Sequence, residues 1–105
     1  MIRRFSLVRK LPGLTREEFV AAWKGEHVDY ARRLPGLRGY VIHILDGADP
    51  PFDGIAITTF DSREDAERAF ADPELGEGLS RTRDDFAASV EVFFAEEHVI
   101  IEEET

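Results

Sequence analysis

Apolar residues in the first third of the chain recur at steps of three and four, the spacing of one face of an α-helix. Thr15 followed three residues later by Glu18 is a capping box, which predicts a helix beginning at Arg16. Pro35 and Gly36 predict its end, because the residue before a proline is biased away from helical geometry. The apolar face consists of Phe19, Ala22, Trp23, Tyr30 and Leu34, with His27 at its centre.

Four segments alternate in polarity or are rich in β-branched residues, which predicts β-strands. They are residues 2–9, 37–45, 54–60 and 88–95. In the first strand Phe5 and Leu7 share one face, and Ser6 and Val8 share the other.

The predicted strand at 37–45 is largely apolar on both faces, so both faces should be covered. One face carries Tyr40, Ile42 and Ile44, and the other carries Val41, His43 and Leu45.

Two further helices are predicted in the second half of the chain. One begins at Ser62 and turns Ala66, Ala69 and Phe70 inward. Asp72 followed by Pro73 predicts a short third piece, with Asp as the cap and Pro at the first helical position. We expect this piece to be loose, because it contains two glycines. After the last strand, residues 99–101 form a further extended apolar run.

This order of elements, βαββαβ, is typical of the α+β ferredoxin-like fold, a four-stranded antiparallel sheet with helices on one face. The 105 residues are expected to form one such domain, 1–105. The other face of the sheet would be left bare and apolar, so we expect a second copy to cover it in a homodimer. Val41, His43 and Leu45 are expected at or near that interface.

Composition narrows the possible partners and sites. The net charge of −9 disfavours nucleic acid and anionic membrane surfaces as partners. The absence of cysteine excludes disulfides, thiolate metal sites and cysteine nucleophiles. No apolar run approaches the roughly 20 residues of a membrane span, and the N-terminal segment is predicted to be a strand rather than a signal peptide. A cytoplasmic protein is therefore expected.

His27 and Tyr40 are the candidate catalytic residues. A histidine on a buried helix face is shielded from water, which disfavours its charged form and suits a proton acceptor near neutral pH. Tyr40 opens the strand that follows this helix, and its hydroxyl could bind or protonate a substrate oxygen. The alternative for each is core packing with a backbone hydrogen-bond partner. The three histidines lack metal-ligand spacing, so no metal site is predicted.

The helix pattern Phe19-x3-Trp23-x3-His27, followed by Leu34-Pro35-Gly36-Leu37-x-x-Tyr40, resembles the EthD family of the dimeric α/β-barrel superfamily. It also resembles the related methylmuconolactone methylisomerases, in which the matching helix histidine lines the cleft. The resemblance implies a homodimer whose two sheets form a shared barrel, with a cleft in each subunit between sheet and helices. The resemblance predicts the fold but does not select a reaction, because proteins with one fold can catalyse many different reactions.

The leading hypothesis is a cofactor-independent isomerase, dehydratase or monooxygenase acting on a small cyclic or aromatic metabolite. His27 would move the proton and Tyr40 would bind the oxygen on which charge develops. The apolar, substrate-binding wall is predicted to consist of Phe5, Leu7, Trp23, Tyr30 and Ile42. A non-catalytic ligand-binding or accessory protein is the main alternative. Haem binding is a third, because some members of the superfamily carry haem, but no haem-specific motif is present and no cofactor is expected.

Overall fold

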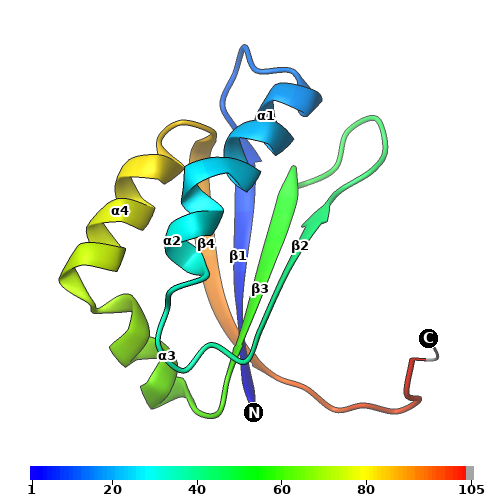
Figure 1. Cartoon of the computed structure of the whole chain (residues 1–105). Helices are drawn as coiled ribbons and strands as arrows, with labels where there is room; N and C mark the ends of the chain where they lie inside the picture. The colour runs from blue at the N-terminus through cyan, green and yellow to red at the C-terminus, as the bar shows by residue number, and fades with distance from the viewer. Residues whose placement is uncertain (104–105) are drawn as a thin grey trace.

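The computed structural model of the chain describes residues 1–103. Its strands are β1 (Ile2–Lys10), β2 (Gly39–Ile44), β3 (Gly54–Phe60) and β4 (Ala87–Glu96). Its helices are α1 (Arg16–Ala22), the π-helical turn η1 (Trp23–His27), α2 (Val28–Ala31), α3 (Arg63–Phe70) and α4 (Pro73–Arg83). The strands form one antiparallel sheet in the order β2-β3-β1-β4 (Figure 1). This arrangement is the predicted α+β ferredoxin-like fold.

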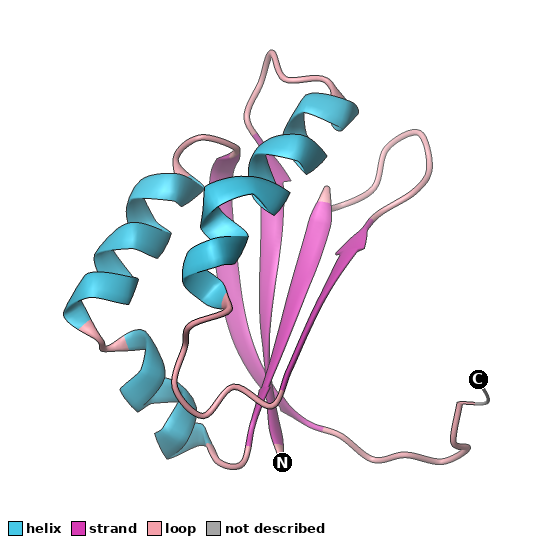
Figure 2. Ribbon diagram, viewed as in Figure 1, coloured by secondary structure: helices cyan, strands magenta, loops and turns pink. Residues whose placement is uncertain are grey.

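Within residues 1–103, all the helices lie on one face of the sheet, and none of them covers the opposite face (Figure 2). The strand register assigns the side chains of β1 to these two faces. Arg4, Ser6 and Val8 point toward the helices, and Phe5 and Leu7 point to the bare face. The bare face carries a group of apolar side chains drawn from all four strands: Phe5, Leu7, Val41, Ile55, Ile57 and Phe93.

The first helix begins as predicted. The Thr15 hydroxyl accepts a hydrogen bond from the Glu18 amide at 3.0 Å, and the Glu18 carboxylate accepts one from the Thr15 amide at 2.8 Å. The prediction of one uninterrupted helix is wrong. The helix widens into a π-helical turn at η1, where Gly25 has the non-helical angles φ −82° and ψ −126°. Such turns rotate the following residues relative to an ideal α-helix, and they occur often at functional sites.

Helix α4 is longer than the short, loose piece expected from its glycines. It runs for 11 residues, and the Asp72 carboxylate caps it by accepting a hydrogen bond from the Leu75 amide at 2.9 Å. Gly78 is buried against α2, where an added Cβ would lie 2.4 Å from the ring of Tyr30. The glycine therefore allows two helices to approach closely rather than weakening one of them.

The core consists of two apolar clusters between the helices and the sheet. In one, the buried rings of Phe19, Trp23 and Phe86 pack with centroids 5.3–6.0 Å apart. The other surrounds Phe60, which is fully buried. Tyr40 packs against both clusters, so it lies where they meet.

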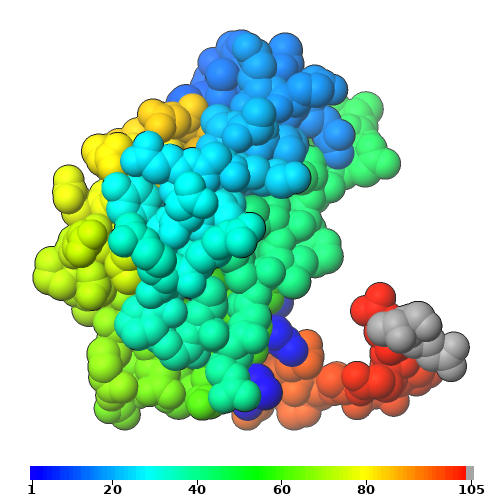
Figure 3. Space-filling view, viewed as in Figure 1, coloured from blue at the N-terminus to red at the C-terminus, as the bar shows by residue number. Residues whose placement is uncertain are grey.

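The C-terminal segment after β4 leaves the body of the molecule, as the space-filling view shows (Figure 3). The predicted apolar run at 99–101 does not join the sheet, and Val99, Ile100 and Ile101 are 59%, 87% and 87% exposed. Close to its start, Glu97 forms an ion pair with Arg3 of β1 at 2.6 Å.

Candidate functional site

A partly enclosed cavity of about 90 Å³ lies between the helices and the sheet, several times the space that one water molecule needs. Apolar side chains from both core clusters form most of its wall. Its polar side chains come from three strands and two helical segments: Arg4, Ser6, His27, Tyr40, Thr58 and Arg83. Both predicted catalytic residues therefore line the same cavity.

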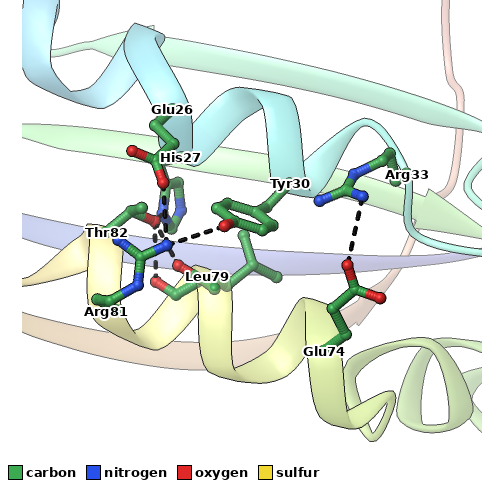
Figure 4. A network of polar contacts seen from close by, with 9 residues as sticks. Glu26, His27, Tyr30, Arg33, Glu74, Leu79, Arg81 and Thr82 are labelled. Atoms are coloured by element: carbon green, nitrogen blue, oxygen red, sulfur yellow. Dashed lines mark hydrogen bonds and ion pairs between the residues drawn. The ribbon is translucent and has the colours of Figure 1, made fainter.

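The tautomer of His27 follows from its hydrogen bonds to α4 (Figure 4). Its Nδ1 lies 2.7 Å from the Thr82 hydroxyl, and that hydroxyl donates its proton to the carbonyl of Gly78 at 2.7 Å. With the Thr82 proton on the Gly78 carbonyl, Thr82 accepts the hydrogen of Nδ1, because a hydroxyl has one proton. Nε2 of the neutral ring then carries the free lone pair, which a general base needs.

Burial lowers the pKa of His27 from 6.5 to about 4. The positive charge of Arg83 acts in the same direction, and the carbonyl of Leu79 acts weakly against it. The ring also packs edge-on against Phe86, with the ring centroids 5.0 Å apart. At neutral pH His27 is therefore uncharged, and a ring nitrogen is available to accept a proton, although a pKa of about 4 makes it a weak base.

This pKa predicts how stability depends on pH. Because the pKa falls from 6.5 in the unfolded chain to about 4 in the folded one, the unfolded chain binds a proton first as the pH falls. The contribution of His27 to the free energy of unfolding should be fully present above pH 6.5 and should be lost toward pH 4. Urea unfolding of the parent and of His27→Gln between pH 5 and 7 should show a steeper decrease in the parent. Parallel curves would contradict the lowered pKa.

Tyr40 is suited to donate a hydrogen bond within this cavity. Burial raises its pKa, and the neighbouring Trp23 indole and Arg32 only partly offset this effect. The phenol therefore keeps its proton at neutral pH and can donate it to a substrate oxygen. The two groups are complementary, because the Tyr40 hydroxyl can donate a proton and Nε2 of His27 can accept one.

The residues predicted to form the apolar wall do not all lie together. Trp23 lines the cavity, but Phe5 and Leu7 lie on the bare face of the sheet, away from the cavity. Ile42 lies on the helix side but lines a neighbouring groove, which Tyr40 also touches. Tyr30 packs over α4 outside the cavity lining, where its hydroxyl accepts a hydrogen bond from Arg81 at 2.8 Å (Figure 4).

Several residues of the site were missed in the sequence. Thr82 and Phe86 are almost fully buried beside His27, and Arg4 and Arg83 supply positive charge to the cavity. The alternation of β1 was the available signal for Arg4, because it shares a face with Ser6 and Val8.

The described residues lack two other features that would indicate a different kind of site. Within residues 1–103, no three His, Cys, Asp or Glu side chains are grouped as metal ligands would be. In the same part of the chain, no helix has the length and the apolar character that crossing a membrane requires.

The fold and the cavity define a ferredoxin-like α+β protein with a helix-covered site. The chain belongs to the EthD domain family, which matches residues 11–89. None of the curated protein sequences matches it.

Solved structures resemble the chain at low sequence identity. An ethyl tert-butyl ether d (EthD) family protein from Bacillus halodurans is 19% identical, with a TM-score of 0.76 over 93% of this chain and 100% of its own. A dimeric protein of unknown function from Bacteroides fragilis is 11% identical, with a TM-score of 0.69 over 90% of this chain and 94% of its own. SnoaB, a cofactor-independent oxygenase from Streptomyces nogalater, is 15% identical, with a TM-score of 0.69 over 97% of both chains.

Proposed function

We propose that this protein is a homodimeric, cofactor-independent enzyme that moves a proton on a small cyclic or aromatic metabolite. One observation carries the proposal: His27 and Tyr40 line one mostly apolar cavity in complementary protonation states. The base has a free Nε2 because Thr82 accepts the hydrogen of Nδ1. The similarity to SnoaB supports a reaction without a cofactor in this fold.

The geometry supports a two-residue mechanism. Nε2 of His27 would take a proton either from a carbon next to a carbonyl group or from an ionisable hydroxyl group on the ring. Negative charge would then develop on the substrate oxygen, and the Tyr40 hydroxyl would donate a hydrogen bond to it. The apolar wall would exclude water and strengthen that bond. Return of the proton to another carbon gives isomerisation, and loss of water from the anion gives dehydration. Addition of O2 to a CH2 carbanion gives a hydroperoxide, which loses water to leave a carbonyl at that carbon, so no external reductant is needed.

The homodimer belongs to the same proposal. Six apolar side chains lie on the bare face of the sheet, and Val41 and Phe93 are 51% and 55% exposed in the single chain. A contiguous apolar face of this kind marks an interaction surface in a water-soluble protein. The structural similarity to a dimeric ferredoxin-like protein supports a second copy as the partner.

Deuterium exchange tests the proposed reaction without knowledge of the product. The protein would be incubated in D2O with ring ketones, lactones and substituted phenols, and deuterium uptake at carbon would be followed by NMR. We expect protein-dependent uptake at one position of at least one compound. Tight binding across the panel with no uptake would instead indicate a ligand-binding protein.

A further inference from the structure

The cavity carries two arginines and no acid to balance them. Within residues 1–103, its lining includes Arg4 and Arg83 but no Asp or Glu, although the chain has 22 acidic residues and a net charge of −9. Neither arginine has an ion-pair partner in that part of the chain. The site is therefore locally cationic in an acidic protein.

Arg4 is held in place by contacts that leave most of its donors unused. Its guanidinium stacks 3.7 Å from the ring centre of Phe70, and its Nη1 donates a hydrogen bond to the Ser6 hydroxyl at 3.0 Å. A guanidinium has five N–H donors, so the described residues use a small share of them. Glu67 lines an adjoining surface depression that Arg4 also reaches, but its carboxylate pairs with Arg63 at 2.9 Å.

Arg83 adds a second positive charge on the helix side of the cavity. It is exposed, and its one side-chain hydrogen bond to the described residues is a long one of 3.4 Å to the Ser80 hydroxyl. Its charge acts on both Arg4 and His27, which places the three groups in one electrostatic neighbourhood. Two cations that face one space repel each other, so a bound anion would relieve that repulsion.

We propose that the substrate is a ring compound with a carboxylate, which Arg4 and Arg83 bind while His27 and Tyr40 act on the ring. A half-buried cation without a protein partner is costly, and an anionic ligand offsets that cost. The planar fork of arginine matches a carboxylate, and the rings of Trp23 and Phe86 in the same wall suit an apolar ring. The roles of His27 and Tyr40 in this inference rest on the proposed function. The binding of the carboxylate by Arg4 and Arg83 does not, and it can be tested by equilibrium binding alone.

Benzoate and benzamide form a matched pair of probes for the carboxylate, since they have similar shapes and differ in charge. Dissociation constants would be measured by NMR titration of the isotope-labelled protein. We expect benzoate to bind the parent at least about tenfold more tightly than benzamide, because hydrogen bonds to a charged group are stronger. Inorganic phosphate at the same concentration should not displace benzoate, because it lacks an apolar ring.

Three variants assign that preference to residues. Arg4→Gln should lose most of the benzoate preference with little change in benzamide binding, and Arg83→Gln should lose a smaller part. Arg9→Gln removes the same charge from the same strand, but its side chain is exposed and lies on the other face, so the preference should be retained. Arg83 is exposed, so its variant remains informative even if Arg4→Gln fails to fold.

His27→Ala separates this inference from the proposed reaction, because it should retain the preference for benzoate while losing proton transfer. A benzoate preference without any deuterium exchange would keep the anion site and reject the enzyme. Equal affinities for the two probes in the parent, failure of both probes to bind, or a preference that survives both Arg4→Gln and Arg83→Gln would overturn the anion site. Displacement of benzoate by phosphate would keep an anion site but overturn the carboxylate-bearing ring as its ligand.

Discussion

His27→Ala is expected to abolish most proton exchange while leaving the protein folded. General acid–base catalysis by a positioned side chain contributes roughly 10²–10⁴-fold, so the exchange rate should fall by about that factor. The ring fills space beside Phe86 and is half-buried, so its loss should cost some stability as well. The measurement is the rate of deuterium uptake by NMR, with circular dichroism as the check on folding.

Two substitutions at Thr82 test whether the hydrogen bond at Nδ1 sets the tautomer of His27. Thr82→Val keeps the shape but cannot accept the Nδ1 hydrogen, and exchange should fall by less than in His27→Ala. Thr82→Ser keeps the hydroxyl that contacts both His27 and Gly78, so exchange should stay close to that of the parent.

A His27→Ala protein that exchanges deuterium at the parental rate would return His27 to a packing role.

Much of the fold followed from local chemistry that the sequence displays. The capping box at Thr15 and the caps at Ser62 and Asp72 all form, because each side chain satisfies a backbone amide at a helix start. The predicted bounds of β3 match the structure at both ends. Tyr40 and Val41 lie on opposite faces of the sheet, as predicted. These features depend on neighbours within four residues or on the simple alternation of a strand.

The errors came from properties that depend on distant partners. Phe5 and Leu7 were assigned to the apolar wall of the cavity, but they lie on the bare face of the sheet. In this sheet the bare face is also apolar, so alternation shows that two faces differ but not which one the helices cover. Arg4 was missed for a different reason, because a charged residue in a strand is usually exposed.

The π-helical turn and Gly78 could not have been derived from helix propensity. The wide turn places His27 against α4, and its stabilising contacts come from Thr82 and Phe86, which lie far along the chain. From helix propensity alone, Gly78 is expected to weaken the helix. The structure explains the glycine, because the ring of Tyr30 packs against it and leaves no room for a side chain. Tertiary packing decides both features.

Phe93→Asp is expected to convert a homodimer into a monomer. Phe93 is 55% exposed in the single chain and pairs with Phe5 across β1 and β4 on the bare face. Burying a phenylalanine stabilises by roughly 1.5–3 kcal/mol. An aspartate there would lose that contribution and would also bring an unpaired carboxylate into an apolar interface, at a cost of several kcal/mol more.

The change should be visible directly in mass. Light scattering at micromolar concentration should give twice 11.9 kDa for the parent and 11.9 kDa for the variant. Val92→Asp is the matched control: Val92 precedes Phe93, is 41% exposed, and lies on the helix side of the sheet, where it lines the depression beside Arg4. That variant should remain dimeric. A parent that is already a monomer with a cooperative unfolding transition would contradict the dimer, and dissociation of both variants would show that added charge alone, rather than the bare face, controls assembly.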